Sequence, residues 1–367
     1  MVEWNILGNL CEIGTGSNNR EDACDNGLYP FFVRSKEVLR IDSYLYDEEA
    51  VLIPGEGGVG DIFHYINGKY GLHQRTYRVH PISTKVSGRY LFYYLSGNFK
   101  SYINSKSYKA TAASIRKPML IDFPIALPVV EEQKRIVDIL DTFTASIDNL
   151  KEQIAQRRKQ YEYYRDQLLD LEGKDEKDIH TWGEFCEMIK GNGVQKVDFV
   201  EEGVGCIHYG QIYTHYGPYT YTTNKFVSQE VFENARKASK GDIIMTDTSE
   251  NVEDICKSVA YLGEDEIAVS NHALIIKHKQ NPKFLSYSTQ TNSFFLQKRK
   301  VVVGVKVSGI KPEHLAQIKI YLPSIEKQNE IVDILDKFEA SIQNLEAQLS
   351  QREKQYEYYR NKLLTFE

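Results

Sequence analysis

Residues 127–169 read LPVVEEQKRIVDILDTFTASIDNLKEQIAQRRKQYEYYRDQLL, and residues 322–364 read LPSIEKQNEIVDILDKFEASIQNLEAQLSQREKQYEYYRNKLL. The two segments are identical at 28 of 43 positions, without a gap, at an offset of 195 residues. The stretches of more than a hundred residues that precede the two copies are far less alike. A long repeated segment joined to divergent ones indicates a duplicated chain whose halves share one part and differ in the other.

Apolar and aromatic residues recur in both copies at alternating steps of four and three residues. This 3.5-residue period keeps one stripe facing a partner helix and is typical of a coiled coil. Each copy starts beside a proline, Pro128 or Pro323, and has no glycine or proline after it. We therefore predict two long helices that pair through the seam residues Ile136, Leu140, Phe143, Ile147, Leu150, Arg157, Tyr161, Tyr164, Ile331, Leu335, Phe338, Ile342, Leu345, Arg352, Tyr356 and Tyr359.

Antiparallel pairing of these helices is expected from the connection between them. A helix of about 40 residues is ~60 Å long. A parallel pair would require the chain to travel back over that length after the second head, whereas an antiparallel pair lets the chain leave and re-enter at the same end. The two heads should then lie at opposite ends of the helix pair.

Two polar features of the repeat allow more than one interpretation. Arg157 and Arg352 share one seam position, where a polar residue can fix the register of the pair. Alternatively, the arginine stem packs while its guanidinium reaches solvent or an aromatic face. The run QYEYYR, at residues 160–165 and 355–360, has more tyrosines than one seam requires. It is either a docking surface for another protein or part of the helix packing.

The repeat divides the chain into two heads and two helices. At 367 residues two domains are expected. Short alternating apolar runs separated by Gly, Asn and Asp predict mixed α/β heads with mainly antiparallel sheets. Helical patterns fall at 87–101 and 283–297. We predict an α/β (mixed), pseudo-two-fold chain with a first head at 1–126, a helix at 127–172, a linker at 173–179, a second head at 180–322 and a helix at 323–367.

Short matches between the two heads indicate a common fold. Ile115, Arg116 and Leu120 correspond to Ile310, Lys311 and Leu315 at the same 195-residue offset as the helices. Both heads also begin with a tryptophan followed by a cysteine, Trp4 with Cys11 and Trp182 with Cys186. The whole chain is therefore interpreted as a divergent duplication.

The net charge of −6 comes from the helices. Residues 1–126 carry 14 basic and 13 acidic side chains, and residues 173–322 carry 18 and 19. Residues 127–172 carry 7 against 10, and residues 323–367 carry 6 against 9. Heads that are nearly neutral can bind nucleic acid only if their basic residues gather on one face.

The five cysteines indicate neither a disulfide framework nor a metal site, because their number is odd and no CxxC or Cys/His pattern at zinc spacing occurs. Free thiols suit a reducing compartment. The chain has no secretion signal at its start and no apolar run long enough to cross a membrane. A soluble cytoplasmic protein without a bound metal is expected.

Polar side chains near turns, among aromatic and basic neighbours, are the candidate base readers. Asn and Gln can bond adenine N6 and N7, and Arg can bond guanine O6 and N7. Any single one could instead be a solvated turn residue. The candidates in the first head are Asn18, Asn19, Arg20, Arg34, Ser35, Lys36, His73, Gln74, Arg75 and Arg116, and those in the second are Asn192, Gln195, Lys196, His208, Gln211, Thr246, Asp247, Asn271, His272 and Lys311.

No motif in the chain predicts catalysis. GEGGVG at 55–60 fits a dinucleotide fingerprint by letters, but the residues after it alternate like a strand, so the required helix is missing. The run NVEDICK at 251–257 has the residue types of a nuclease cluster and is interpreted as a surface charge run. There is no Walker phosphate loop and no base-holding loop of an amino-methyltransferase. A binding protein with no catalytic residues of its own is predicted.

Two heads, each followed by a helix that begins LPxxExQxxIVDILDxFxASI and ends QYEYYRxxLL, closely resemble the DNA specificity subunit of type I restriction-modification systems. The resemblance covers nearly the whole chain. It implies that each head reads one half of a bipartite, asymmetric double-stranded DNA site. It also implies that the helices set the spacer and dock two methyltransferase subunits. Restriction and translocase subunits would complete the complex, and S-adenosylmethionine, ATP and Mg would bind to those partners and not to this chain.

Two other functions stay open on the sequence alone. One is a structural adaptor whose two heads bind proteins instead of DNA. The other is a stand-alone DNA methyltransferase or nuclease. A preference of the assembled complex for particular DNA sequences would exclude the adaptor. Labelling or cutting of DNA by the purified chain alone would support the stand-alone methyltransferase or nuclease.

Overall fold

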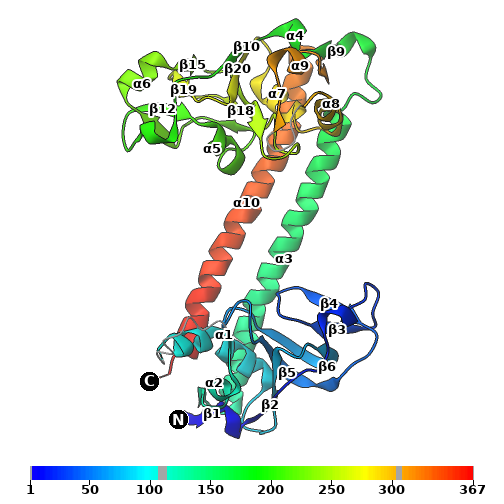
Figure 1. The fold of residues 1–367 in the computed structure, drawn as a ribbon, viewed down its shortest axis with the longest axis vertical. Coiled ribbons are helices and arrows are strands. Elements are labelled where there is room, and N and C mark those ends of the chain that lie inside the picture. Colours follow the sequence, from blue (N-terminus) through cyan, green and yellow to red (C-terminus); the bar gives the residue numbers. More distant parts are fainter. Residues whose placement is uncertain (1, 106–113, 303–307, 367) are drawn as a thin grey trace. The chain divides into compact units, whose positions relative to one another are not determined.

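The computed structural model describes residues 2–105, 114–302 and 308–366 (Figure 1). The chain divides into two compact units, one made of Met1–Glu152 with Glu346–Glu367 and the other of Gln153–Leu345. The division crosses both long helices, so each unit holds one head together with a segment of each helix.

Unit 1 contains the first head, which is built on a six-stranded sheet of order β2-β7-β5-β6-β3-β4. Every ladder in it is antiparallel except that between β3 and β6. A further pair, β1 with β8, closes the head beside its exit into the helix. The elements are β1 (Glu3–Ile6), η1 (Leu7–Asn9), β2 (Cys11–Thr15), η2 (Arg20–Asp22), β3 (Tyr29–Phe32), β4 (Val38–Ile41), β5 (Tyr46–Pro54), β6 (His64–Leu72), β7 (Thr76–Pro81), α1 (Gly88–Ser105), α2 (Lys117–Ile121) and β8 (Pro124–Leu127).

Unit 2 contains the second head, which has two five-stranded sheets of order β10-β20-β16-β18-β13 and β11-β14-β12-β19-β15. The strands are β9 (Ile179–Thr181), β10 (Cys186–Lys190), β11 (Phe199–Val200), β12 (Val204–Ile207), β13 (Tyr219–Thr220), β14 (Lys225–Val227), β15 (Arg236–Ala238), β16 (Ile243–Thr246), β17 (Thr248–Ser249), β18 (Ser258–Tyr261), β19 (Ile267–Val269), β20 (Ala273–His278), β21 (Ser308–Gly309) and β22 (Lys319–Tyr321). The short helices are η3 (Glu176–Asp178), α4 (Trp182–Phe185), η4 (Lys196–Asp198), α5 (Tyr209–Thr214), α6 (Gln229–Asn234), α7 (Pro282–Ser288), α8 (Asn292–Val301) and α9 (Pro312–Leu315).

The helical pattern predicted at 283–297 is two helices, not one. Helix α7 ends at Ser288, and α8 begins at Asn292 after an extended Thr291 whose hydroxyl accepts from the backbone N–H of Phe294. A threonine at this position satisfies a free N–H at the start of a helix and so favours a new start over continuation. In the first head the corresponding helix α1 is continuous.

The heads share a backbone frame, as the 195-residue matches predicted. The backbone N–H of Ile115 donates to Gly55 over 2.7 Å, and that of Ile310 donates to Asp247 over 2.9 Å. The N–H of Leu7 donates to Phe123, and that of Trp182 donates to Ile318. Leu7 therefore occupies in the first head the place that Trp182 has in the second. Trp4 is half exposed on β1, so the predicted correspondence of the two tryptophans was wrong.

The repeated segments form α3 (Val130–Leu169) and α10 (Ile325–Leu364), each of 40 residues. In unit 1 the ring of Phe143 stacks on that of Tyr359, with centroids 5.3 Å apart, and Lys151 pairs with Glu353 over 3.5 Å. As the α3 number rises from 143 to 151, the α10 number falls from 359 to 353. The predicted antiparallel pairing is confirmed within this unit.

Unit 2 repeats the contact with the two copies exchanged. Tyr164 stacks on Phe338 at 5.5 Å, which is the counterpart of Phe143 on Tyr359. The guanidinium of Arg157 lies over Phe338, as that of Arg352 lies over Phe143 in unit 1. The two seam arginines thus cover an aromatic face of the opposite helix, an arrangement that favours this register over its neighbours.

The heads are fixed on the helices by two pairs of equivalent polar residues. Gln133 is fully buried, donates to the carbonyls of Lys85 and Pro128, and accepts from the N–H of Ser87, next to the start of α1. Gln328 is also fully buried; it donates to the carbonyl of Pro323 and to the side-chain oxygen of Gln280, and it accepts from the N–H of Asn281, which precedes α7. Each glutamine therefore joins the entry of its long helix to the N-terminus of a helix in the head.

Aspartates eight residues further along, about two turns of the helix, repeat this arrangement. Asp141 accepts from Arg89 over 2.8 Å and from the hydroxyl of Tyr93, and Asp336 accepts from Lys283 over 2.7 Å and from the hydroxyl of Tyr287. Both tyrosines are fully buried, so the aspartate satisfies a hydroxyl that would otherwise lose its partner.

Most of the predicted seam is covered in the folded chain. Ile136, Leu140, Ile147, Leu150, Tyr161, Ile331, Leu335 and Ile342 are buried, and Phe143, Arg157, Phe338, Leu345, Arg352 and Tyr356 are partly buried. Tyr164 and Tyr359 stay more than two fifths exposed although each stacks on a phenylalanine. Among the helices of the described residues, none has the length and apolar character needed to span a bilayer.

Candidate functional site

Loop ends from distant parts of the sequence meet at one end of the first head's sheet. The backbone of Asn18 bonds to Leu72 and to Gln74, which brings the loop after β2 beside the turn between β6 and β7. The N–H of Gly55 donates to Arg75, which adds the end of β5 to the same group. These backbone hydrogen bonds continue those of the sheet, so the sheet fixes the positions of the loops. We call this set of backbone bonds the frame of the head.

A carboxylate joins two predicted base readers in this group. Arg34, after β3, and Arg75, before β7, donate through Nη1 to Oε2 of Glu56 over 3.2 and 2.9 Å. The three side chains are 45%, 56% and 36% exposed, so the cluster is open to a ligand. The Arg75 guanidinium, with Arg34, holds the pKa of the Glu56 carboxyl below its usual range. Glu56 was not among the predicted site residues.

Amide side chains lie beside these arginines. The Nε2 of Gln74 donates to Oδ1 of Asn19 over 2.6 Å, and Asn19 precedes the short helix η2. His73 is 6% exposed, and its Nδ1 accepts from the N–H of Arg75. Burial, and then the charges of Arg34 and Arg75, lower the pKa of His73.

The other predicted residues of the first head lie at the edges of the group. Arg20 is exposed at the start of η2, and Lys36 is exposed in the turn between β3 and β4. The hydroxyl of Ser35 donates to the carbonyl of Glu37, and the Ser35 carbonyl bonds His64 over 3.1 Å. Arg116 is exposed and follows Ile115, whose N–H bonds Gly55.

The same frame in the second head carries different side chains. At the ends of the parallel strands β3 and β6, Phe32 pairs with Leu72, and at the ends of β12 and β19, Ile207 pairs with Val269 in the same way. The frame bond from His73 to Phe32 has its counterpart in the bond from Ser270 to Ile207. Counting on from these positions, Arg34 corresponds to Tyr209, Arg75 to His272 and Gly55 to Asp247.

A buried carboxylate lies at this place in the second head. Asp247 is 4% exposed and is approached by Nζ of Lys190 at 3.2 Å and by Nδ1 of His272 at 3.9 Å. The Tyr209 ring packs edge-on against that of His272, with centroids 5.3 Å apart. His272 has φ +65°, a conformation that non-glycine residues seldom adopt and that often marks a functional position. The sequence prediction missed Lys190 and Tyr209.

Asn271 belongs to this second site, since its Oδ1 accepts from the N–H of Gly193 over 3.1 Å. His208 is 5% exposed beside the Tyr209 ring, and burial, followed by the charges of Lys196 and His272, lowers its pKa. Lys196 is exposed in η4.

Several predicted readers of the second head are engaged inside the protein or lie apart. Thr246 is fully buried, with its hydroxyl directed to the carbonyl of Lys257, and Gln211 is buried with its amide bonded to Asn224 and to the His208 N–H. Asn192 accepts from the N–H of Arg236, and Gln195 from that of Asp198 in a capping box. Lys311 is exposed at the start of α9, 3.9 Å from Glu313. The buried Thr246 and Gln211 therefore support the loops of the head, whereas Asn192, Gln195 and Lys311 are exposed.

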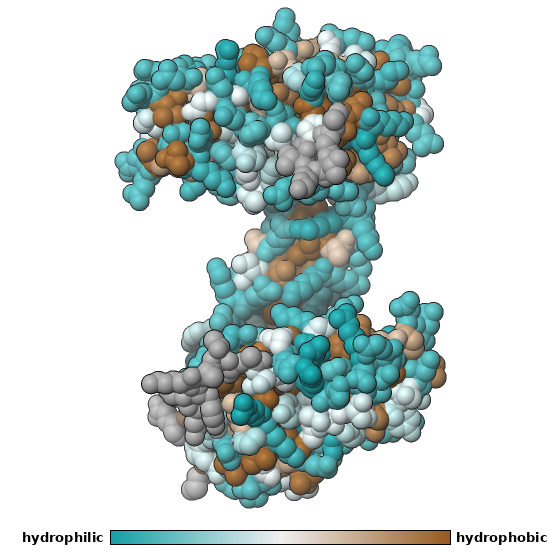
Figure 2. All heavy atoms as spheres, viewed as in Figure 1, coloured by the Kyte–Doolittle hydropathy of each residue, from teal (hydrophilic) through white to brown (hydrophobic). Residues whose placement is uncertain are grey.

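The helices present a hollow of about 750 Å³ in unit 2. It is lined by Arg157, Lys159, Gln160, Tyr163, Tyr164, Leu168, Ile334 and Phe338. All eight have an identical counterpart in the other copy, namely Arg352, Lys354, Gln355, Tyr358, Tyr359, Leu363, Ile139 and Phe143. Tyr163 and Tyr358 are each about 60% exposed. Figure 2 shows heads that are mostly hydrophilic on the visible face and apolar residues along the exposed helices.

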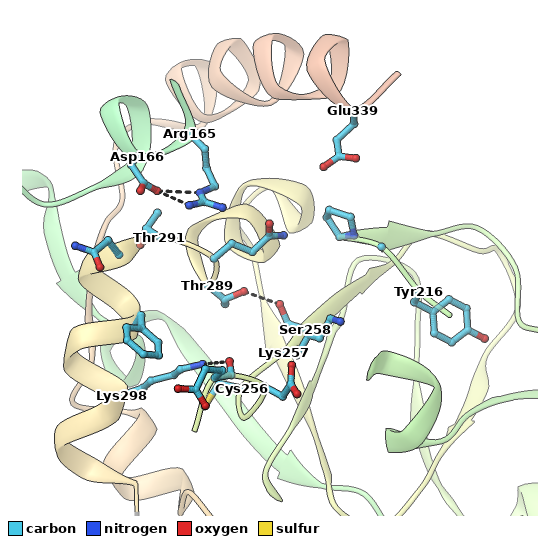
Figure 3. Close-up of a pocket in the computed structure, with 17 residues that line it drawn as sticks. Arg165, Asp166, Tyr216, Cys256, Lys257, Ser258, Thr289, Thr291, Lys298 and Glu339 are labelled. Carbon is cyan, nitrogen blue, oxygen red and sulfur yellow. Dashed lines mark hydrogen bonds and ion pairs between the residues drawn. The ribbon is translucent and has the colours of Figure 1, made fainter. Parts of the chain in front are cut away.

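A second cavity of about 750 Å³ lies where the second head meets the helices in unit 2 (Figure 3). Its cations are engaged: Arg165 pairs with Asp166 over 2.8 Å, and the buried Lys298 donates to two backbone carbonyls. Burial raises the pKa of the Cys256 thiol to about 12, so it is not a nucleophile at neutral pH. No histidine is among the described lining residues, and Ser258 bonds Thr289 instead of a base. The described lining of this cavity therefore offers no serine or cysteine activated by a histidine.

The described residues contain no group of three or more His, Cys, Asp or Glu side chains placed to hold a metal ion. What the structure offers is two polar loop sites on equivalent frames and a duplicated helix surface.

These features define a duplicated recognition protein with one candidate ligand site in each head. The chain belongs to the type I restriction modification DNA specificity domain family, whose model matches residues 1–157 and again 176–353. It is thus a sequence-specific DNA recognition subunit of a restriction-modification complex.

Known relatives agree with the family. The type I restriction enzyme EcoDI specificity subunit of Escherichia coli is 36% identical over 165 residues, which cover 44% of this chain and 36% of that one. The type I restriction enzyme MjaVIII specificity subunit of Methanocaldococcus jannaschii is 23% identical over 93% of this chain and 83% of its own. The crystal structure of a type I restriction-modification S subunit from M. genitalium has the same fold, with a TM-score of 0.62 and 16% identity over 100% of this chain and 97% of that chain.

Proposed function

We propose that each head reads one half of a bipartite, asymmetric DNA site. The observation that carries this proposal is that equivalent backbone positions carry different chemistry. Arg34, Gly55 and Arg75 of the first head correspond to Tyr209, Asp247 and His272 of the second. The carboxylate between the two arginines, Glu56, lies one residue after Gly55. Different donors and acceptors at one place select different bases. Two identical heads would instead favour a palindrome.

We also propose that the helices set the spacer between the half-sites and dock two methyltransferase subunits. The eight identical lining residues of the helix hollow support this, because two copies of one partner require two equal surfaces. Exposed tyrosines such as Tyr163 and Tyr358 are the residue type that protein interfaces favour. We propose further that catalysis belongs to the partner subunits, with S-adenosylmethionine, ATP and Mg bound to the methyltransferase and to the restriction and translocase subunits.

Methylation mapping tests the reading of DNA. The chain is purified with its methyltransferase subunit, incubated with a random-sequence DNA library and S-adenosylmethionine, and the modified positions are sequenced. We expect a two-part motif with a fixed spacer and different halves. Methylation without any sequence preference would contradict the proposal, and so would methylation or cutting by the purified chain alone.

The stoichiometry of the complex tests the docking surface. Tyr163→Glu and Tyr358→Glu each place a charge in one copy of the surface. Each single variant should bind one methyltransferase subunit and the double variant none, as measured by light scattering after size exclusion. Tyr221→Glu, at a tyrosine of similar exposure in the second head, is the control and should bind two. Unchanged stoichiometry in the double variant would refute this docking surface.

A further inference from the structure

Building on the proposed function, we propose that Arg34, Glu56 and Arg75 form the element of the first head that selects a G·C base pair. The second head has no such cluster at the equivalent position. Dependence on this base pair should therefore be confined to the half-site that the first head reads.

The cluster leaves free the groups that such a base pair would bind. Both arginines bond the same carboxylate oxygen, Oε2, and each does so through Nη1 alone. The Oε1 of Glu56 accepts no hydrogen bond from the described residues. A guanidinium carries five donors in a fixed fork, so most of the donors of Arg34 and Arg75 remain available. All three side chains are at least one third exposed.

A G·C pair presents the complementary set in the major groove. Guanine offers the acceptors O6 and N7, which match an arginine fork, and cytosine offers the N4 donor, which matches a carboxylate. A pair of this quality discriminates against a wrong base by roughly 5- to 150-fold. A purely electrostatic role fits less well, because a partly exposed carboxylate between the two cations would repel a phosphate.

The backbone fixes the cluster in place. Glu56 forms an isolated bridge with Ser114, and the neighbouring Gly55 donates to Arg75 and accepts from Ile115. Gly57 has φ +74°, a conformation that favours glycine and lets the chain turn immediately after Glu56. The glycine run that resembled a dinucleotide motif by letters therefore positions a carboxylate between two arginines.

The second head shows why the selection should be local. Tyr209 and His272 replace the two arginines by position, and the carboxylate there, Asp247, is 4% exposed and faces Lys190. A buried carboxylate cannot reach a base edge as Glu56 can. The two half-sites are expected to differ at this point.

The test uses the full chain in complex with its methyltransferase subunit and compares the methylated motifs of variants. Arg75→Lys keeps the charge and removes the fork, and Glu56→Gln removes the acceptor charge. The double variant Arg34→Ala with Arg75→Ala removes both forks. Arg135→Ala is the control for loss of one exposed cation, since Arg135 lies on α3 and pairs with Glu132.

We expect Arg75→Lys, Glu56→Gln and the double variant to accept other base pairs at one position of one half-site, with a loss of preference of about 5-fold or more. The other half-site and the spacer should not change, and Arg135→Ala should leave the whole motif intact. Variants with an unaltered motif would overturn the inference, as would uniform weakening on all sequences with a smaller salt dependence, which indicates phosphate contacts. If the wild-type complex has no two-part motif, the proposed function fails. If it has one and the variants do not relax it, only the G·C assignment fails.

Discussion

The buried glutamines that join heads to helices give a sharp prediction about stability. Gln328→Leu removes the acceptor for the Asn281 N–H and the donors to the carbonyl oxygens of Pro323 and the Gln280 side chain. The contact with Pro323 is buried, and the other two are partly buried. A buried group without its partner costs about 1–3 kcal/mol, and water compensates in part for the others. We expect a loss of about 2–4 kcal/mol in the free energy of unfolding.

Trp182 provides a reporter for this measurement, because it is fully buried in the core of unit 2 while Trp4 is half exposed. With Trp4→Phe as the background, urea unfolding followed by tryptophan fluorescence reports on the second head. Hydrogen exchange should show faster opening of α7 in Gln328→Leu, and of α1 in the equivalent Gln133→Leu.

The control for this prediction is Gln343→Leu, the same substitution at an exposed position of α10. It should change stability by no more than about 0.5 kcal/mol. If Gln328→Leu costs no more than Gln343→Leu, the inference that the buried amide holds the head on the helix is wrong. Faster exchange spread evenly over the chain would contradict it too.

Other perturbations probe the seam, the thiols and the pH response. Ile342→Asp places a charge at a seam position that is 7% exposed and should abolish assembly with the methyltransferase, as seen by size exclusion, whereas Gln343→Asp should not. Ellman's reagent should label Cys24 first in the native protein, and Cys24→Ser should remove that fast phase, because burial raises the pKa of the other four thiols to about 12. Burial lowers the pKa of His278, so below pH 6.5 the unfolded chain binds a proton more readily than the folded chain does. The thermal midpoint should therefore fall between pH 7 and pH 5, and it should fall less in His278→Asn.

The helices and the class of the heads could be predicted because their signals are local. A step of four and three residues repeated over ten turns leaves few alternatives to a paired helix, and the contacts Phe143 with Tyr359 and Tyr164 with Phe338 follow from it. The break between α7 and α8 was missed because one side-chain cap at Thr291 outweighs the helical pattern on both sides.

The site could be predicted only in part, because its members meet through long-range pairing. Arg34 and Arg75 were selected by residue type, but nothing near Glu56 in the sequence shows that it lies between them. That position depends on β5 pairing with β7 and on Ile115 bonding Gly55, contacts between residues far apart in the chain. Lys190 was missed for the same reason, since it reaches Asp247 from the end of β10.

The division between backbone frame and side-chain chemistry explains how one duplicated chain supports two specificities. The loops that carry the candidate readers are held by backbone bonds, such as those accepted by Gly55 and Asp247, and these bonds do not depend on which side chain stands there. The contacts with the helices instead use side chains, Gln133 and Gln328 among them, and these are the same in both halves. Substitution of an exposed reader such as Arg34 or Arg75 therefore changes the chemistry offered to DNA at small cost to the fold. Substitution of Gln133 or Gln328 instead weakens the attachment of the whole head to its helix. For this reason the heads can diverge while the helices stay alike.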